Sequence, residues 1–425
     1  MTAILFGSLF VFLLIGVPIA LCLGLASIVA MIFSDNVQLF PVIVQRVFTQ
    51  TDNFTLMAVP FFILAGNIME KGGISRRLID FIELLLRRLP GRLSCITVVA
   101  SAFFGAISGS NPATVAAIGG ITVPRMKKKG YPSDVAGAVA ASAGTLGVVI
   151  PPSIPMVTYA VTASLSVGTM FMAGIVPGLL LAAVLCVTNI VLCSKYDAPD
   201  TSKVTGKEVF HAFTDAILAL LMPVIILGGI YSGLFTPTES AAVACVYSFI
   251  VSIFVYKELK MDGIFAIFRD TAVSSAVVLL VVGLSSPFAW FMTFEDLPSM
   301  IATGFLGLFS NKMVLLLMIN VILLFLGCFL ETQSIILLVT PILLPIATAM
   351  GLSHVALGII IIINTSIGMI TPPMAVNLFV ASGVSGSGIG AISKRIIPYL
   401  VVEVATLLVM TYIPQIITFL PNALG

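Results

Sequence analysis

The sequence predicts an all-helical polytopic membrane protein built from two inverted-topology repeats, each with a re-entrant hairpin and a proline-broken helix. Three observations support this fold class. First, 59% of the 425 residues are hydrophobic and only 9% are charged, whereas about a quarter of the residues in a soluble domain are charged. Second, residues 3–33, 171–193 and 271–294 each form an apolar stretch long enough to cross ~30 Å of hydrocarbon. Third, the chain contains an internal repeat.

Composition and charge narrow the class further. Residues 3–33 are too long an apolar run for a signal peptide, and no Lys or Arg precedes them, so we expect a retained spanning helix. The net charge of +2 favours neither a nucleic acid nor a strongly acidic partner. The 6 cysteines lie in apolar segments without a CxxC pair, so we interpret them as small buried residues rather than metal ligands or disulfides.

Two proline motifs define the internal repeat. The segments GVVIPPS (147–153) and GMITPPM (368–374) each place two prolines four and five positions after a glycine, at an offset of 221 residues (368 − 147). At the same offset, without a gap, Phe104 aligns with Phe325, Pro124 with Pro345, Gly130 with Gly351, Gly137 with Gly358 and Pro177 with Pro398. Such a repeat indicates two copies of one structural unit.

The basic residues predict how the repeats are oriented. Each half is predicted to contain two spanning helices, a lateral helix, a hairpin, a broken helix and a final helix. A ninth helix near residues 211–231 inverts the second half. With the N-terminus in the cytoplasm, all but two of the 20 Lys and Arg residues (Arg46 and Lys312) fall in cytoplasmic segments, as the positive-inside rule requires. Inverted repeats are typical of secondary transporters.

Two predicted hairpins carry polar residues at their tips. The first, about 93–126, has Ser108–Thr114 at its centre, and the second, about 312–350, has Glu331–Ser334 at the matching place. Their arms are too short to span, so each tip is expected near the middle of the membrane, buried in protein or lining a cavity. The two tips are expected to approach each other. An ordinary interhelical turn at a surface is the alternative.

The proline motifs predict oxygen-rich sites for a cation. Four prolines, Pro151, Pro152, Pro372 and Pro373, lack an N–H and so leave the carbonyls of Gly147, Val148, Gly368 and Met369 without helical partners. The hydroxyls expected beside them belong to Ser108, Ser110, Thr145, Ser366 and Thr371. This nearly charge-free set of oxygens suits a hard monovalent cation, which we infer to be Na⁺. Proline kinks used only for packing are the alternative.

The same region predicts an anionic substrate. Helix N-termini after each kink and each tip favour a carboxylate, and no arginine lies at these motifs. Glu331, at the second tip, either lines the site or caps a helix. Glu403 lies inside the apolar final helix, where an ionisable group suggests a function or a buried partner. Its repeat equivalent is Ala182 (403 − 221), so Glu403 lies outside the symmetric site.

Three segments resemble the large membrane subunit of tripartite ATP-independent periplasmic (TRAP) transporters over essentially the whole chain. They are GSNPATVAAIG (109–119), GVVIPPS (147–153) and NTSIGMITPPMAVN (364–377). The resemblance implies a sodium-driven elevator importer of the bacterial inner membrane, with an ion transporter superfamily fold. The predicted number of crossings, with the N-terminus in the cytoplasm, puts the C-terminus in the periplasm. It implies two partners, a small four-helix membrane subunit and a periplasmic substrate-binding protein. No four-helix segment precedes Met1, so the small subunit is expected on a separate chain. The expected cargo is sialic acid or a C4-dicarboxylate, with Na⁺ as coupling ion and no other cofactor.

The resemblance also assigns residues by position. One sodium site takes Ser108, Ser110, Asn111, Thr114, Gly144, Thr145 and Gly147. Its mirror takes Thr332, Ser334, Asn364, Thr365, Ser366, Gly368 and Thr371. The predicted substrate contacts are Asn111, Pro112, Thr114, Pro152, Ser153, Thr332, Pro373 and Asn377.

These assignments divide the chain into a moving and a fixed part. Residues 93–169 and 312–390 are expected to form the transport domain, and residues 1–92, 170–311 and 391–425 the scaffold. The amphipathic, basic segment 74–92 either braces the two parts or anchors the chain to anionic lipid.

Three other functions compete with this prediction. A stand-alone sodium/anion symporter of related fold needs no binding protein. An intramembrane protease would use Ser385 of a GxSG pattern with His211 or His354. A channel is the third. The repeats favour transport over catalysis, so we expect no enzymatic activity.

Overall fold

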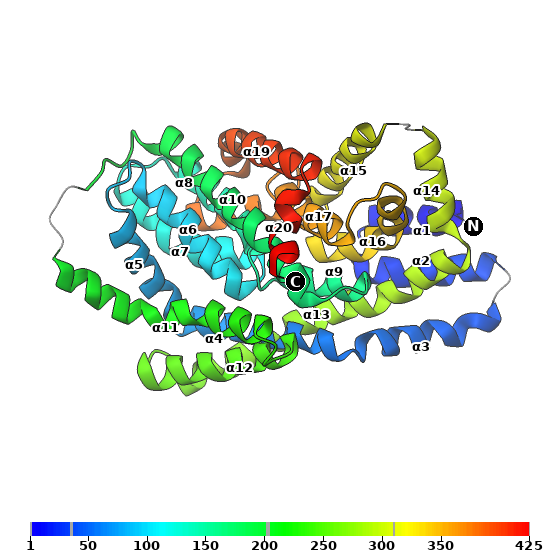
Figure 1. Cartoon of the computed structure of the whole chain (residues 1–425), viewed down its shortest axis with the longest axis horizontal. Coiled ribbons are helices and arrows are strands. Elements are labelled where there is room, and N and C mark those ends of the chain that lie inside the picture. The colour runs from blue at the N-terminus through cyan, green and yellow to red at the C-terminus, as the bar shows by residue number, and fades with distance from the viewer. Residues whose placement is uncertain (1, 35–36, 201–204, 309–310, 425) are drawn as a thin grey trace.

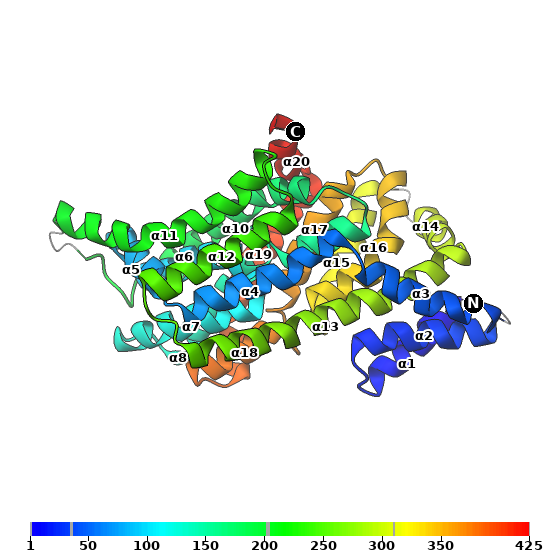
Figure 2. The same cartoon turned by 90° about the horizontal axis from the view of Figure 1, so that it is seen from below.

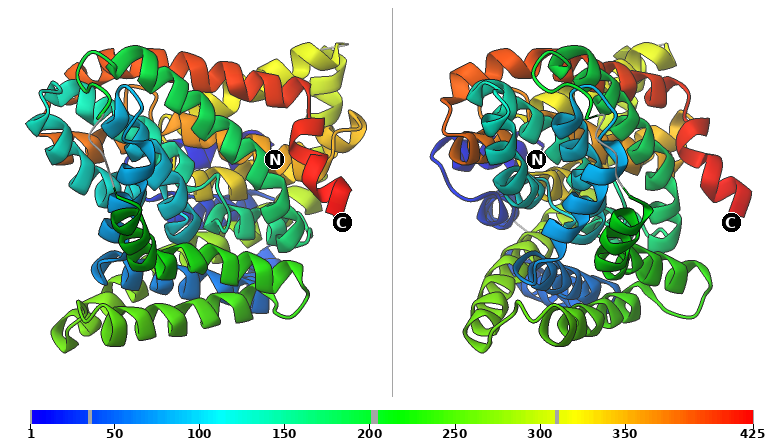
Figure 3. Two further views of the ribbon diagram at one scale, coloured as in Figure 1. Left: turned by 60° about the vertical axis from the view of Figure 1, so that its left-hand side comes forward. Right: turned by 90° about the vertical axis from the view of Figure 1, so that its left-hand side faces the viewer.

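The computed structural model describes residues 2–34, 37–200, 205–308 and 311–424. All regular secondary structure in these ranges is helical, without a strand, which confirms the all-helical class. The helices form an elongated assembly. α3 (Phe40–Thr51), α4 (Ala58–Lys71) and α12 (Pro237–Ile250) run along one long side, and α19 (Ile389–Tyr412) lies on the opposite side (Figure 1, Figure 3).

Several helices are long and apolar enough to cross a membrane. Within the described ranges they number seven: Phe54–Lys71, Val167–Cys193, Gly206–Tyr231, Pro237–Val255, Gly263–Phe294, Thr332–Ala349 and Ile389–Tyr412. Three of them belong to α10 (Val167–Cys193), α11 (Gly206–Tyr231) and α13 (Met261–Phe294). The chain is therefore a multi-pass membrane protein, and α11 occupies the place of the predicted ninth helix.

The first apolar stretch is two helices, so the prediction of one spanning helix over residues 3–33 is wrong. α1 (Thr2–Leu14) and α2 (Ile19–Phe33) are separated by a turn in which Gly16 has φ +83° and Pro18 directly precedes α2. A left-handed residue followed by a proline cannot continue a helix. The chain therefore reverses, and α1 packs antiparallel to α2 (Figure 2). Residues 1–33 contain no Lys or Arg, so the positive-inside rule assigns no side to this helix pair.

Both predicted hairpins form as packed helix pairs. α6 (Arg92–Ser108) and α7 (Asn111–Lys128) make the first, and α15 (Lys312–Gly327) and α16 (Thr332–Ala349) make the second. At the first tip Gly109 has φ +58°, and Pro112 lies in the first turn of α7. A glycine therefore ends one arm and a proline starts the other, as helix termini prefer.

Each hairpin is followed by a helix that stops at the proline motif. α8 (Ser133–Ala143) continues as the 3-10 helix η3 (Gly144–Gly147) before α9 (Ile154–Thr162), whereas α17 (His354–Gly368) stops before α18 (Val376–Ser385). The Pro151–Pro152 and Pro372–Pro373 bonds are cis. α7 and α16 begin 221 residues apart (332 − 111), and so do α8 and α17 (354 − 133). The first break is buried, whereas Pro372 and Pro373 are exposed.

Shorter helices flank these elements. α5 (Ile74–Leu86) and α14 (Leu297–Leu308) precede the two hairpins, where lateral helices were expected, and α20 (Gln415–Leu424) packs on α10. Three short segments, η1 (Val37–Leu39), η2 (Phe54–Met57) and η4 (Val251–Val255), adjoin α3, α4 and α12. α5 buries Ile79 and Ile82 and packs against α6 and α11.

Glycines bring each hairpin into backbone contact with a break. A Cβ atom on Gly105 would lie 2.8 Å from Gly147 Cα, and one on Gly147 would lie 2.6 Å from the Ser110 carbonyl oxygen. In the second half, a Cβ atom on Gly368 would lie 2.5 Å from Gly327 Cα. No side chain fits at these distances, so glycine is required at both contacts.

Replacing Gly147 by alanine tests this contact. Gly147→Ala forces a methyl group against backbone, and overpacking of this kind costs about 1–3 kcal/mol. We expect a lower thermal unfolding temperature for the purified protein in detergent. Gly120→Ala is the matched control, because no heavy atom lies within 4 Å of a Cβ atom there, and helical alanine is favoured over glycine. A Gly147→Ala protein as stable as wild type would contradict the tight contact.

Candidate functional site

The two hairpin tips line one cavity of about 330 Å³. The first tip contributes Ser108–Ala113 and the second contributes Glu331–Gln333. α4 and α13 supply the opposite wall, with Asn67 and Ser274 among its polar residues. The predicted approach of the two tips is therefore present, and neither tip is an ordinary surface turn.

Asn111 joins the first tip to both breaks. Its side chain is fully buried. Its Oδ1 accepts a hydrogen bond from Val148 N at 3.0 Å, and its Nδ2 donates to Ser366 Oγ at 2.7 Å. Ser366 Oγ in turn donates to the Thr145 carbonyl oxygen at 2.7 Å. We call Asn111, Thr145, Val148 and Ser366 the junction. The two proline breaks therefore meet inside the protein, joined through one amide side chain.

Hydroxyl groups surround the first tip. Ser108 Oγ lies 3.1 Å from Thr114 Oγ1, and Thr114 Oγ1 donates to the Ser110 carbonyl oxygen at 2.8 Å. Ser153 Oγ donates to the Val148 carbonyl oxygen at 2.6 Å. The tip thus holds its backbone in a non-helical conformation with its own hydroxyl groups.

Three of the four carbonyls released by the prolines find new donors. Val148 O accepts from Ser153 Oγ, Gly368 O accepts from Thr371 N at 2.9 Å, and Met369 O accepts from Asn377 N at 3.0 Å. The prediction that they lose their helical partners is therefore incomplete, because nearby donors replace those partners. Each carbonyl oxygen has two lone pairs, so each can still accept a further contact.

The predicted site residues fall into three groups. Those that line the cavity are Ser108, Ser110, Asn111, Pro112 and Thr332. Those joined to the lining by the bonds described above are Thr114, Thr145, Ser153 and Ser366. The remaining predicted residues belong to neither group. Of these, Gly144, Gly147, Pro152, Ser334, Asn364, Thr365, Gly368 and Asn377 are buried, Thr371 is half-buried and Pro373 is exposed.

Two buried asparagines keep a free oxygen. Asn364 Nδ2 donates to Asn320 O at 3.0 Å and to Asn320 Oδ1 at 2.8 Å, while Asn377 Nδ2 donates to Ala141 O at 3.4 Å. Among the described residues, neither Asn364 Oδ1 nor Asn377 Oδ1 has a hydrogen-bond partner. Buried oxygens without donors are suited to binding a cation.

The structure adds cavity residues that the sequence analysis missed. Asn67 and Glu70 of α4 and Ser274 of α13 all line the cavity. Asn67 Nδ2 also donates to Thr271 Oγ1 of α13 at 2.9 Å. The available signal was the spacing of Asn67 and Glu70, which puts two polar residues on one face of an apolar helix.

The structure separates the two roles considered for Glu331. Glu331 precedes α16 but makes no side-chain capping bond, and its residue lines the cavity. The structure therefore favours the cavity-lining role over the helix cap.

Glu403 of α19 is fully buried, and neither carboxyl oxygen has a partner within the described chain. The carboxyl faces the Thr145 hydroxyl, but that hydroxyl donates to the Ser142 carbonyl oxygen at 2.7 Å. A buried carboxyl without partners is costly. Its position beside Thr145 places it next to the junction, although it lies outside the repeat.

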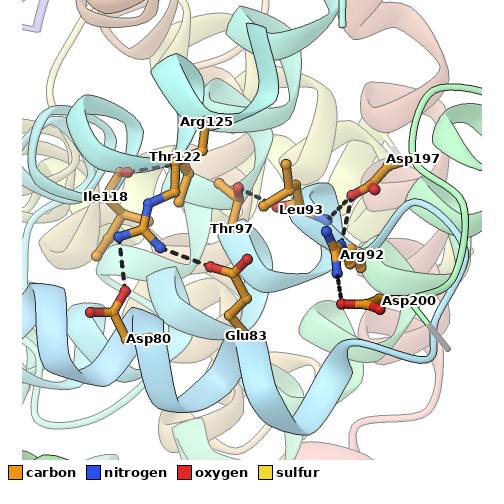
Figure 4. Close-up of polar contacts among 10 residues, drawn as sticks. All are labelled: Asp80, Glu83, Arg92, Leu93, Thr97, Ile118, Thr122, Arg125, Asp197 and Asp200. Atoms are coloured by element: carbon orange, nitrogen blue, oxygen red, sulfur yellow. Dashed lines mark hydrogen bonds and ion pairs between the residues drawn. The ribbon is translucent and has the colours of Figure 1, made fainter. Parts of the chain in front are cut away.

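Ion pairs fix the base of the first hairpin (Figure 4). Arg125 of α7 binds Asp80 and Glu83 of α5, each at 2.8 Å. Arg92 at the start of α6 binds Asp197 at 3.3 Å and Asp200 at 3.2 Å. These pairs tie both arms of the hairpin to neighbouring segments.

A further ion pair joins α19 to α8. Arg395 Nε lies 2.8 Å from Asp134 Oδ2, and this hydrogen bond lowers the pKa of the Asp134 carboxyl from its ordinary value.

Among the described residues, no hydrogen bond joins Ser385 to His211 or His354. Ser385 Oγ accepts from Ser387 N at 3.2 Å, while His354 Nε2 lies 2.9 Å from Thr348 Oγ1. Each group therefore has a local partner. The described residues also hold no group of three or more His, Cys, Asp or Glu side chains that could bind a metal.

Polar hairpin tips around a cavity inside a multi-pass helical protein define a membrane transport protein. Comparison with known families gives the family. Residues 6–416 match the family described as the tripartite ATP-independent periplasmic transporter, DctM component, and the chain belongs to this family.

Curated relatives include large permease proteins of TRAP transporters. The isethionate TRAP transporter permease protein DctMQ of Oleidesulfovibrio alaskensis is 43% identical over 98% of this chain, which spans 66% of that relative. The C4-dicarboxylate large permease protein DctM of Rhodobacter capsulatus is 38% identical over 99% of both chains. The sialic acid large permease protein SiaM of Vibrio cholerae is 37% identical over 96% of this chain and 95% of its own.

A solved structure shares the fold at low identity. The YdaH transporter of Alcanivorax borkumensis aligns with a TM-score of 0.67 and 16% identity, covering 89% of this chain and 88% of its own. This likeness concerns the fold alone.

Replacing Glu403 by methionine separates stability from function. Because neither carboxyl oxygen has a partner, an apolar side chain of similar length removes a desolvation cost of about 1–3 kcal/mol. We expect Glu403→Met to raise the thermal unfolding temperature and to lower uptake in proteoliposomes. Glu403→Gln is the matched control, because its amide is still a buried polar group without partners and is expected to gain little stability. A destabilised Glu403→Met protein would show that the carboxyl has hydrogen-bond partners in the folded protein.

Proposed function

We propose that this chain is the large transmembrane subunit of a sodium-coupled, binding-protein-dependent secondary transporter. It imports an organic acid across the bacterial inner membrane by an elevator mechanism. The observation that carries the proposal is the junction, where Asn111 bonds to Val148 and Ser366 beside a cavity lined by both tips. One set of hydrogen bonds can thus respond to ions at the breaks and to cargo in the cavity.

Sodium coupling is supported by the available oxygens. The Thr145 carbonyl accepts one hydrogen bond from Ser366 and has a second lone pair. Asn364 Oδ1 and Asn377 Oδ1 are buried without donors. Carbonyl, amide and hydroxyl oxygens are ligands that Na⁺ accepts, and both breaks offer them. A sodium ion at these sites interacts with carbonyl and amide oxygens that no protein donor reaches.

The elevator proposal divides the chain at its hairpins. Residues 93–169 and 312–390, one part from each inverted repeat, form the moving domain, and residues 1–92, 170–311 and 391–425 form the scaffold. The N-terminus lies in the cytoplasm and the C-terminus in the periplasm. α5 links the two parts, because its Asp80 and Glu83 hold Arg125 of the moving hairpin.

Two partners complete the transporter: a small four-helix membrane subunit and a periplasmic substrate-binding protein. The relatives support this proposal, because one is named a DctMQ permease and others are named large permeases, a name that implies a separate small subunit. The cargoes in their names are isethionate, C4-dicarboxylate and sialic acid, so the proposed cargo class is an organic acid. Sialic acid and C4-dicarboxylate are the two specific candidates.

Removing the hydroxyl of Ser366 tests sodium coupling. Ser366→Ala deletes the donor to the Thr145 carbonyl and the acceptor of Asn111, so we expect the sodium concentration for half-maximal uptake to rise about tenfold. Asn111→Ala is expected to act in the same direction. The measurement is sodium-dependent uptake in proteoliposomes that contain both membrane subunits and the binding protein.

Ser27→Ala is the matched control for this experiment. Ser27 is equally buried, but its hydroxyl donates only to the Leu23 carbonyl in its own helix, at 2.7 Å. Unchanged sodium dependence in Ser366→Ala would remove the junction from the ion sites. Uptake without the binding protein would instead favour a stand-alone symporter.

Cysteine labelling tests the inverted topology. Lys128 ends α7 and Lys312 begins α15, and both are exposed. Because the two hairpins are proposed to open to opposite sides, a membrane-impermeant maleimide should label Lys128→Cys from the cytoplasm and Lys312→Cys from the periplasm. Labelling of both from one side would refute the inversion.

A further inference from the structure

The cavity presents an excess of hydrogen-bond acceptors toward its cargo. Glu70 and Glu331 line it together with Gln333. Gln333 is 6% exposed, and its Oε1 has no partner within the described residues. Two carboxyl groups therefore line the space in which the cargo is expected, and a buried amide oxygen without a donor lies in the same wall.

No positive side chain balances these acceptors. None of the described residues that line the cavity is Lys, Arg or His. Lys71 follows Glu70 in the chain, but its ammonium group binds Asp270 at 2.8 Å. The group that favours an anion is the N-terminus of α7, which begins at Asn111 beside the cavity, whereas the N-terminus of α16 directly follows Glu331. The cavity can therefore accept one anionic group at the first tip and repels a second one near either glutamate.

We propose that this cavity selects an organic acid with a single anionic group and several hydroxyl donors, and that Glu331 determines this specificity. The acid group lies at the N-terminus of α7, at the first tip. The hydroxyl groups of the cargo donate to Glu331 and Glu70. A dicarboxylate is disfavoured, because its second carboxylate meets a glutamate without a positive partner. This assignment rests on the proposed transport of an organic acid and names which class of acid the cavity takes.

Ligand-induced stabilisation of the purified complex of large and small subunits tests the assignment. The probes are gluconate, a monoanion rich in hydroxyl groups, and succinate, a dianion without them. Each is added as its sodium salt at matched sodium concentration and ionic strength. We expect gluconate to raise the thermal unfolding temperature of the wild type at concentrations where succinate does not, since a bound ligand stabilises the folded state.

Substitution at Glu331 makes the test specific. Glu331→Gln keeps the side-chain length but removes the charge, so we expect the apparent affinity for gluconate to fall about tenfold and the preference over succinate to shrink. Glu331→Asp keeps the charge and is expected to retain the preference, which separates specificity from a folding defect. Glu295→Gln is the matched control, because Glu295 does not line the cavity.

The outcomes separate this inference from the proposed function. Equal or greater stabilisation by succinate, or stabilisation by neither acid, overturns the assignment of cargo class. Unchanged gluconate preference in Glu331→Gln also overturns the role of Glu331. Sodium coupling is judged separately, from whether uptake in proteoliposomes requires sodium, so a failed acid preference leaves that proposal standing.

Discussion

A membrane offers no water to unpaired backbone groups, and this constraint governs the whole structure. The two proline breaks and two hairpin tips interrupt helices and free backbone N–H and C=O groups, and lipid offers these groups no hydrogen-bond partners. The junction solves the problem internally, because Asn111 accepts from Val148 N and reaches Ser366, which in turn donates to the Thr145 carbonyl. One amide side chain therefore stabilises two irregular segments that lie more than two hundred residues apart in the chain, so each break depends on the other.

Close contact of backbones makes this solution possible. Gly105 packs on Gly147, and Gly327 packs on Gly368, with no space for a methyl group at either contact. The two halves have similar glycine contacts and similarly spaced helix N-termini. Their proline breaks differ in burial, since the first break is buried and Pro372 and Pro373 are exposed. The two proline breaks thus occupy different environments in one structure.

Sequence reasoning succeeded where structure depends on local chemistry. Glycine and proline mark helix ends directly, so the hairpins, their tips and the breaks could be placed to within a few residues. It failed where hydropathy outweighed the same signals, because the apolar run of residues 3–33 predicts one helix whereas Gly16 and Pro18 divide it into two. Asn67 and Glu70 were missed because their helix was assigned to the scaffold as a whole. Glu403 and Thr145 lie close together although they come from distant parts of the chain, and no local pattern encodes this proximity.

The unpaired polar atoms of the core have a consistent chemistry. For the buried amides Asn364 and Asn377 the nitrogen has a partner while the oxygen has none, and both oxygens of Glu403 are likewise unpaired. Each such oxygen destabilises the empty protein by about 1–3 kcal/mol. A structure selected for stability alone would pair these groups or replace them with apolar ones. A structure that must bind and release cations gains from keeping them, because the energy that binding recovers at these oxygens shifts the population toward the loaded state.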